Sequence, residues 1–100
     1  MASRLKRILV VDDEQLIRDI VSKMLTGSGF EVTVADTAYE GLDLFHKKEF
    51  DLVITDLEMP GMNGWSLASQ IKEEAPEIPV VLITGSIRDD IEEKKGNKKQ

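Results

Sequence analysis

The sequence contains no cysteine and a single histidine. The missing thiols exclude disulfide bonds and thiolate metal sites. One histidine does not make a metal site, and we expect His46, which stands beside two lysines, at the protein surface. No apolar run approaches the roughly 20 residues of a membrane span, and the first residues lead directly into a short strand-like run instead of a signal-peptide core. We therefore expect a cytoplasmic protein with no membrane partner.

Positive charge is scarce as well. The chain has 13 Lys and Arg residues and 19 Asp and Glu residues, so its net charge is −6. Nucleic-acid phosphates attract basic surfaces, so we expect no nucleic-acid binding by this domain. Apolar residues make up 41% and charged residues 32%, a composition typical of soluble globular proteins. We expect a single domain over residues 1–100, made of an N-terminal extension (1–6), a core (7–85) and a charged tail (86–100).

Four short apolar runs alternate with three amphipathic stretches. The runs predict strands over 7–13, 31–35, 52–56 and 80–84, and the stretches predict helices over 15–28, 37–47 and 63–75. This alternation predicts an α/β fold with a parallel sheet, right-handed crossovers and helices on both faces. Helical spacing places Leu16, Ile20 and Met24 on the apolar face of the first helix, and Trp65 on that of the third.

Local signals mark where two of the helices begin and end. Thr37, with Glu40 three residues later, has the form of a capping box, and Asn63 can cap the third helix. The third helix should end before Pro76, because a residue that precedes proline leaves the helical region.

Polar residues stand at the carboxyl ends of three predicted strands: Asp12 and Asp13 after the first, Asp56 on the third and Thr84 on the fourth. Parallel strands bring like ends to one edge of the sheet, where α/β proteins bind ligands. Crowded carboxylates repel one another, which raises their pKa values or requires a cation. An open site with oxygen ligands suits Mg²⁺ better than Ca²⁺, and Asp56 beside such an ion could act as a nucleophile. A simpler alternative is that an aspartate after a strand merely caps the next helix.

Three segments together carry a resemblance to a known family. They are Ile-Leu-Val-Val-Asp-Asp-Glu at 8–14, Asp-Leu-Val-Ile-Thr-Asp-Leu-Glu-Met-Pro-Gly-Met-Asn-Gly at 51–64, and Val-Val-Leu-Ile-Thr-Gly at 80–85. With these motifs the chain resembles the receiver domain of bacterial two-component response regulators. The resemblance implies a flavodoxin-like three-layer α/β/α sandwich with strand order 2-1-3-4. It also implies that the chain is not an enzyme, beyond catalysing its own phosphorylation and dephosphorylation.

The resemblance assigns roles to the acidic residues. Asp56 corresponds to the phosphoacceptor, which takes a phosphoryl group from a phosphohistidine of a sensor histidine kinase or of a phosphotransfer protein. Asp12, Asp13 and Asp56 correspond to the side chains that organise Mg²⁺, and the backbone carbonyl of Glu58 corresponds to a further ligand.

Three other residues correspond to the surroundings of the phosphoryl group. Thr84 resembles the switch hydroxyl, Gly85 the small residue that leaves the group room to enter, and Leu57 a residue of the phosphoryl pocket. In this family phosphorylation shifts a conformational equilibrium, which is a local change of charge that biases a two-state element.

The sequence departs from the family after Thr84. Receiver domains have a fifth strand, which carries a lysine, and a fifth helix, but the 16 residues after Thr84 show no apolar strand pattern. We expect both elements to be absent and phosphotransfer to be weakened by the loss of a charge donor. The strand over 80–83 would then be an exposed apolar edge, which predicts a homodimer or a swapped dimer through this strand.

Two other functions stay open at this point. A pseudo-receiver would keep the fold as a binding or dimerisation module without competent phosphorylation, and the missing lysine and fifth strand favour it. A metal-dependent phosphatase with an aspartyl nucleophile would use Glu58, two residues after Asp56, as its second acid, although 100 residues leave no substrate cap.

Overall fold

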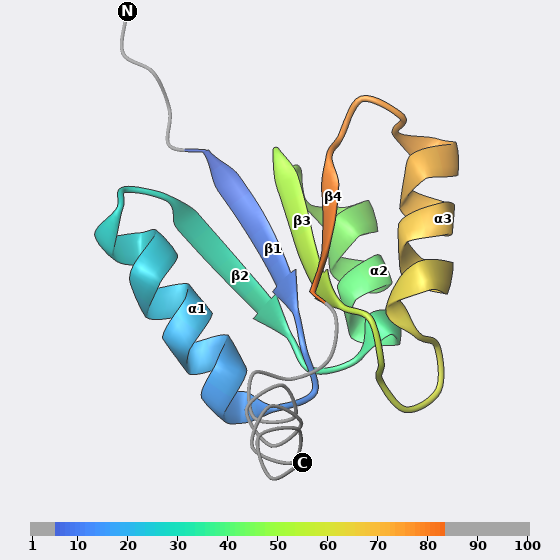
Figure 1. The fold of residues 1–100 in the computed structure, drawn as a ribbon. Coiled ribbons are helices and arrows are strands. Elements are labelled where there is room, and N and C mark those ends of the chain that lie inside the picture. The colour runs from blue at the N-terminus through green and yellow to red at the C-terminus, as the bar shows by residue number, and fades with distance from the viewer. Residues whose placement is uncertain (1–5, 84–100) are drawn as a thin grey trace, which may run out of the picture.

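The computed structural model describes residues 6–83, which form one sheet and three helices (Figure 1). The strands are β1 (Arg7–Val11), β2 (Glu31–Ala35), β3 (Leu52–Asp56) and β4 (Val80–Ile83), and the helices are α1 (Gln15–Gly27), α2 (Ala38–Lys47) and α3 (Gly64–Glu74). All strand pairs are parallel, and the strand order is β2-β1-β3-β4. The predicted flavodoxin-like fold with order 2-1-3-4 is confirmed. The predictions about a fifth strand, a fifth helix and a charged tail concern residues 84–100, outside the described residues.

The inner strand β1 is buried on both faces of the sheet. Successive side chains of a strand point to opposite faces, so Ile8 and Val10 lie on one face while Leu9 and Val11 lie on the other. All four are buried. A continuous apolar run is what a parallel strand requires when helices cover the sheet from both sides.

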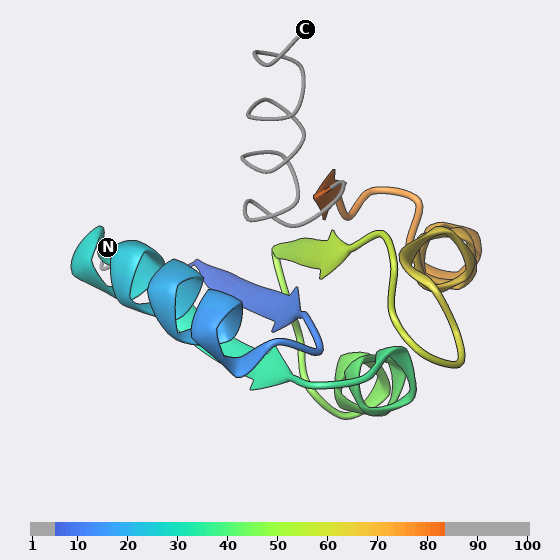
Figure 2. The same ribbon diagram turned by 60° about the horizontal axis from the view of Figure 1, so that its bottom comes forward.

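The face that carries Leu9 and Val11 holds the main core. α2 packs on β1 and β2, and α3 packs on β3 and β4, so helices cover all four strands on this face (Figure 2). The rings of Phe45 and Phe50 stack with their centroids 6.3 Å apart at one side of this core. The buried apolar residues of the core are Leu9, Val11, Ala35, Ala38, Phe50, Val53, Met59, Leu67 and Ile71.

The opposite face is covered over only half of its width by the described helices. α1 packs on β1 and β2, and none of its Cα atoms lies within 8 Å of a Cα atom of β3 or β4. Ile17, Val21 and Leu25, which recur at helical spacing along α1, are half-buried against β1 and β2. No residue of α1 is fully buried.

Four apolar side chains of the helices are exposed instead of packed. Leu16, Ile20 and Met24 of α1 are exposed to 66%, 42% and 66%, because no described element packs beside the helix over β3 and β4. Trp65 of α3 is 60% exposed. The sheet-facing side of α3 carries Leu67, and two helical residues turn a side chain by about 200°, which directs Trp65 away from the sheet.

The helix boundaries follow the predicted signals. Thr37 caps α2 by accepting a hydrogen bond from the Glu40 amide at 3.0 Å, and the Glu40 carboxylate accepts one from the Asp36 amide at 3.0 Å. Asn63 caps α3 by accepting a hydrogen bond from the Ser66 amide at 2.9 Å. This cap therefore fixes the end of the loop that leads from β3 into α3.

His46 lies at the surface, as predicted, with 48% of its side chain exposed. Its Nε2 atom lies 2.7 Å from a carboxylate oxygen of Glu74, which joins the ends of α2 and α3. Among residues 6–83, no helix combines the length and the apolar content that crossing a membrane would require.

Candidate functional site

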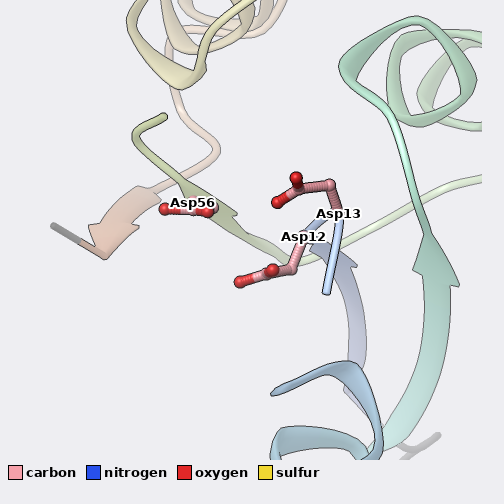
Figure 3. Close-up of side chains that lie close together, drawn as sticks. All are labelled: Asp12, Asp13 and Asp56. Atoms are coloured by element: carbon pink, nitrogen blue, oxygen red, sulfur yellow. The ribbon is translucent and has the colours of Figure 1, made fainter. Parts of the chain in front are cut away.

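Three aspartates meet at the carboxyl edge of the sheet, where β1 and β3 end (Figure 3). Asp12 and Asp13 directly follow β1, and Asp56 is the last residue of β3. Each contributes one carboxylate oxygen to a group whose members all lie within 4.8 Å of one another. The two strands are parallel neighbours, and this topology brings together acids that are far apart in the sequence.

Asp12 is almost completely buried, and hydrogen bonds to its backbone amide and carbonyl fix its position. Its amide donates to the Ala35 carbonyl at 3.1 Å, and its carbonyl accepts a hydrogen bond from the Arg18 guanidinium at 2.7 Å. Its carboxylate accepts a hydrogen bond from the Glu14 amide at 2.9 Å. Glu14 is itself the N-cap residue of α1, so Asp12 bonds an amide that precedes the helix and does not cap the first turn.

Asp56 is half-buried, and its position is fixed by contacts of the strand end. Its carbonyl accepts a hydrogen bond from the buried Thr55 hydroxyl at 3.0 Å, and its carboxylate accepts a long one from the Glu58 amide at 3.4 Å. The next amide, that of Leu57, donates to the Ile83 carbonyl of β4 at 2.9 Å. The neighbouring strand β4 therefore helps to hold the end of β3, and with it Asp56, at the sheet edge.

The loop after Asp56 turns back closely on the strand end. The Gly64 amide donates to the Leu57 carbonyl at 2.9 Å. A Cβ atom at position 64 would overlap the Asp56 carbonyl oxygen and would approach the Leu57 Cα to 2.9 Å. Gly61 has a φ of 79°, a left-handed conformation that glycine adopts without strain. The path of this loop therefore depends on glycine at two positions.

Burial and mutual repulsion make negative charge costly at this site. The pKa of Asp12 is raised from 3.8 to about 6, first by burial and then by the charges of Asp56 and Asp13, while the hydrogen bond from the Glu14 amide opposes the rise. Burial likewise raises the pKa of Asp56, with the hydrogen bond from the Glu58 amide opposing it and the Asp13 charge adding to it. A cation among these carboxylates would relieve this cost.

The chemistry of the donor group fits a hard divalent cation. All of its members are carboxylates, and Asp13 is exposed, so one side of the group is open to water. Oxygen donors in an open arrangement suit Mg²⁺, which retains several of its waters when it binds to proteins. The residues that could hold a metal are thus Asp12, Asp13 and Asp56.

The structure describes two of the other four predicted site residues. Leu57 is half-buried and Glu58 is exposed, and both directly follow Asp56. Their assigned roles, in the phosphoryl pocket and as a carbonyl ligand, stay predictions. Thr84 and Gly85 follow β4 and lie outside the described residues, so their roles stay predictions too.

The sequence reasoning missed two residues that support the site, Arg18 and Gly64. Arg18 lies in the first turn of α1, where a cation opposes the helix dipole, and this mismatch was a usable signal of another partner. Gly64 stood in a segment rich in turn residues, so nothing in the sequence distinguished its tight contact with Asp56 from ordinary turn formation.

Comparison with known proteins agrees with this geometry. The family model of the response regulator receiver domain matches residues 8–96. The DNA-binding transcriptional regulator NtrC of Klebsiella pneumoniae is 39% identical over 75 residues, which are 75% of this chain and 16% of NtrC. The chain therefore spans less than a fifth of the length of that relative.

Two solved structures share the fold. The chemotaxis protein CheY4 of Vibrio cholerae has a TM-score of 0.77 at 30% identity, over 92% of this chain and 80% of that chain. The response regulator TrrA of Thermotoga maritima, solved in complex with Mg²⁺ and BeF, has a TM-score of 0.79 at 38% identity, over 84% of this chain and 73% of that chain. With the sheet order and the acidic edge already described, the family match establishes that the chain belongs to the response regulator receiver domains of two-component systems.

Proposed function

We propose that the chain accepts a phosphoryl group on Asp56 and that this modification switches a signalling conformation. The observation that carries the proposal is the close group formed by the carboxylates of Asp12, Asp13 and Asp56 at the sheet edge. Membership of the receiver family supports it, because receiver domains are phosphorylated by histidine kinases.

Asp12, Asp13 and Asp56, together with the carbonyl of Glu58, would hold a Mg²⁺ ion. When bound, this ion supplies positive charge that offsets the carboxylates and the oxygens of an incoming phosphoryl group. The raised pKa values of Asp12 and Asp56 support the presence of a cation in the working protein. TrrA, solved with Mg²⁺ and BeF, is a relative in which this chemistry is compatible with the fold.

In the proposed transfer, a carboxylate oxygen of Asp56 attacks the phosphorus of a phosphohistidine. An O–P bond forms as the N–P bond breaks, and the electron pair of the broken bond stays on the imidazole nitrogen. Asp56 reacts as the carboxylate, so it releases no proton in this step. The contribution of the chain is orientation, which the Thr55 hydroxyl and the Glu58 amide supply at the strand end.

Thr84, Gly85 and Leu57 complete the proposed phosphoryl site. Thr84 directly follows β4, the strand whose Ile83 carbonyl already receives the Leu57 amide. A hydroxyl at that position would donate a hydrogen bond to a phosphoryl oxygen, and Gly85 would leave room for the group. The added charge would then bias the position of the segment after β4.

The proposed donor is a sensor histidine kinase or a phosphotransfer protein, and the proposed location is the cytoplasm. The chain would turn over no outside substrate and so would not act as an ordinary enzyme. NtrC is by name a DNA-binding protein, but this chain matches only 16% of it. We assign no DNA contact to this domain, whose net charge is −6.

Intact-mass measurement tests the proposal. Incubation with Mg²⁺ and acetyl phosphate should add the mass of one phosphoryl group to the wild-type chain and none to Asp56→Asn. Asp43→Asn is the matched control, because Asp43 is an exposed aspartate of α2 that pairs with Lys47 at 3.1 Å, and it should be modified like wild type. If wild type gains neither the phosphoryl group nor a beryllofluoride adduct in Mg²⁺, the proposal fails and the pseudo-receiver alternative replaces it.

A further inference from the structure

Asp12 and Asp13 direct their carboxylates the same way although they are consecutive residues. Successive side chains of an extended strand point to opposite faces of the sheet, so a straight continuation of β1 would separate the two carboxylates. Instead the chain bends at Asp13, and both carboxylates extend towards Asp56 (Figure 3). Oxygens of the three side chains then lie within 4.8 Å of one another. This meeting therefore depends on the orientation of the peptide group that joins Asp12 to Asp13.

Arg18 holds that peptide group by its oxygen. The Arg18 guanidinium donates a hydrogen bond of 2.7 Å to the carbonyl of Asp12, which is the carbonyl of this peptide group. The bond is short, as expected of a charged donor. The backbone amide of Arg18 donates to the Glu14 carbonyl at 3.1 Å, so the base of the side chain is anchored in the first turn of α1. Arg18 therefore ties the bend to the helix that follows it.

We propose that Arg18 is a positioning residue of the cation site, which fixes the angle between the carboxylates of Asp12 and Asp13 and so strengthens the binding of Mg²⁺. The inference rests on the metal ion of the proposed function. Asp13 is exposed, so packing does not fix its side chain, and its direction follows from that of the peptide group before it. Groups that orient metal ligands without touching the metal contribute to affinity in this way.

Loss of the Arg18 bond would loosen the bend without abolishing it. The Glu14 amide restrains the same bend by its 2.9 Å hydrogen bond to the Asp12 carboxylate, and the Asp12 amide stays bonded to β2 through the Ala35 carbonyl. The peptide group after Asp12 would nevertheless gain freedom to rotate. Mg²⁺ would then have to order Asp13 as it binds, and this ordering reduces the affinity.

The charge of Arg18 would act in the opposite direction. A guanidinium beside the site repels a divalent cation, so removal of its charge alone should strengthen the binding of Mg²⁺. A cation in the first turn of a helix also opposes the helix dipole, so loss of this charge should not destabilise α1. Weaker binding of Mg²⁺ after removal of Arg18 would therefore come from lost positioning and not from lost charge.

Calorimetric titration with Mg²⁺ tests the inference. Arg18→Met removes the donor but keeps an unbranched side chain, and its Kd for Mg²⁺ should exceed that of wild type by at least roughly tenfold. Arg18→Gln, which is polar but too short to make the same bond, should show a similar loss, whereas Arg18→Lys retains a charged donor and should recover most of the affinity. Lys23→Met is the matched control, because it removes the same charge from an exposed position of α1, and it should not bind Mg²⁺ more weakly than wild type does.

Urea unfolding of the same variants separates positioning from a purely structural role. The Kd is measured on the folded chain, so a residue that only stabilises the fold would lower the free energy of unfolding and leave the Kd unchanged. If Arg18→Met and Arg18→Gln bind Mg²⁺ as tightly as wild type or more tightly, the inference is overturned while the proposed phosphoryl transfer still stands. A wild type that depends on Arg18 for Mg²⁺ but gains no phosphoryl mass would support the inference and contradict the proposed transfer alone. A wild type that binds no Mg²⁺ would overturn both.

Discussion

Asp12 couples the charge of the acidic site to the stability of the fold. Folding raises its pKa from 3.8 to about 6, so the folded chain holds this proton more tightly than the unfolded chain does. The stability contributed by the protonated form is complete below about pH 4 and is lost as the pH rises towards 6. At neutral pH without a cation, the buried carboxylate therefore destabilises the protein.

Replacing this charge should stabilise the metal-free chain at neutral pH. Asp12→Asn retains an oxygen that can accept the hydrogen bond from the Glu14 amide, so it changes mainly the charge. We expect its free energy of unfolding at pH 7 to exceed that of wild type by up to about 3 kcal/mol, and the difference to vanish near pH 4. Urea unfolding in EDTA at both pH values measures this difference. A variant no more stable than wild type at pH 7 would contradict the argument.

At the scale of elements, the start of α3 packs directly against the end of β3. This close contact is possible because Gly64 has no side chain. Gly64→Ala places a methyl group against the Asp56 carbonyl and the Leu57 Cα, so the strand end or the helix must move. We expect a loss of about 2–3 kcal/mol in the free energy of unfolding. Weaker binding of Mg²⁺, measured by calorimetry, should accompany this loss because the displaced backbone carries Asp56.

Gly27 provides the matched control for this substitution. It ends α1, has no positive φ, and a Cβ atom there meets no other atom within 4 Å. Gly27→Ala should therefore leave stability unchanged or raise it by up to about 1 kcal/mol, as expected for alanine in a helix. Equal losses for the two variants would show that the contact with Asp56 is not the cause.

The elements themselves were predictable from local signals, whereas their surroundings were not. The runs that end at Asp13 and Asp56 predicted strands, and their parallel order predicted that the acids would meet. The sequence placed Ile20 on an apolar helix face. Helical spacing identifies which side chains share a face, but it does not tell whether another element lies opposite them. The place of Arg18 in the first turn of α1 indicated that it has a partner, but no sequence pattern identifies that partner, which is the backbone carbonyl of Asp12.

At the scale of the whole molecule, binding of a cation should increase the free energy of unfolding. A ligand that binds only the folded state stabilises it, by about 2.7 kcal/mol at one hundred times its Kd. Mg²⁺ should therefore raise the Tm of wild type at pH 7. Asp13→Asn should lose most of this rise because it removes one of the three carboxylates.

Asp43→Asn is again the control variant. It distinguishes the effect of the charge in the acidic site from the effect of the net charge of the chain. It removes one negative charge from an exposed position on α2, so the net charge changes as it does in Asp13→Asn. Scanning calorimetry with and without Mg²⁺ should show an unaltered rise in Tm for Asp43→Asn. Equal responses from both variants would mean that Mg²⁺ acts through general screening and not through the acidic group.

The outward position of Trp65 gives the molecule a built-in optical probe. It is the only tryptophan of the chain, so its indole emission arises from one known place. Trp65 directly follows Gly64, whose amide donates a hydrogen bond to the carbonyl of Leu57, the residue after Asp56. Fluorescence titrations can therefore follow the loop beside the acidic edge in the unlabelled wild-type protein.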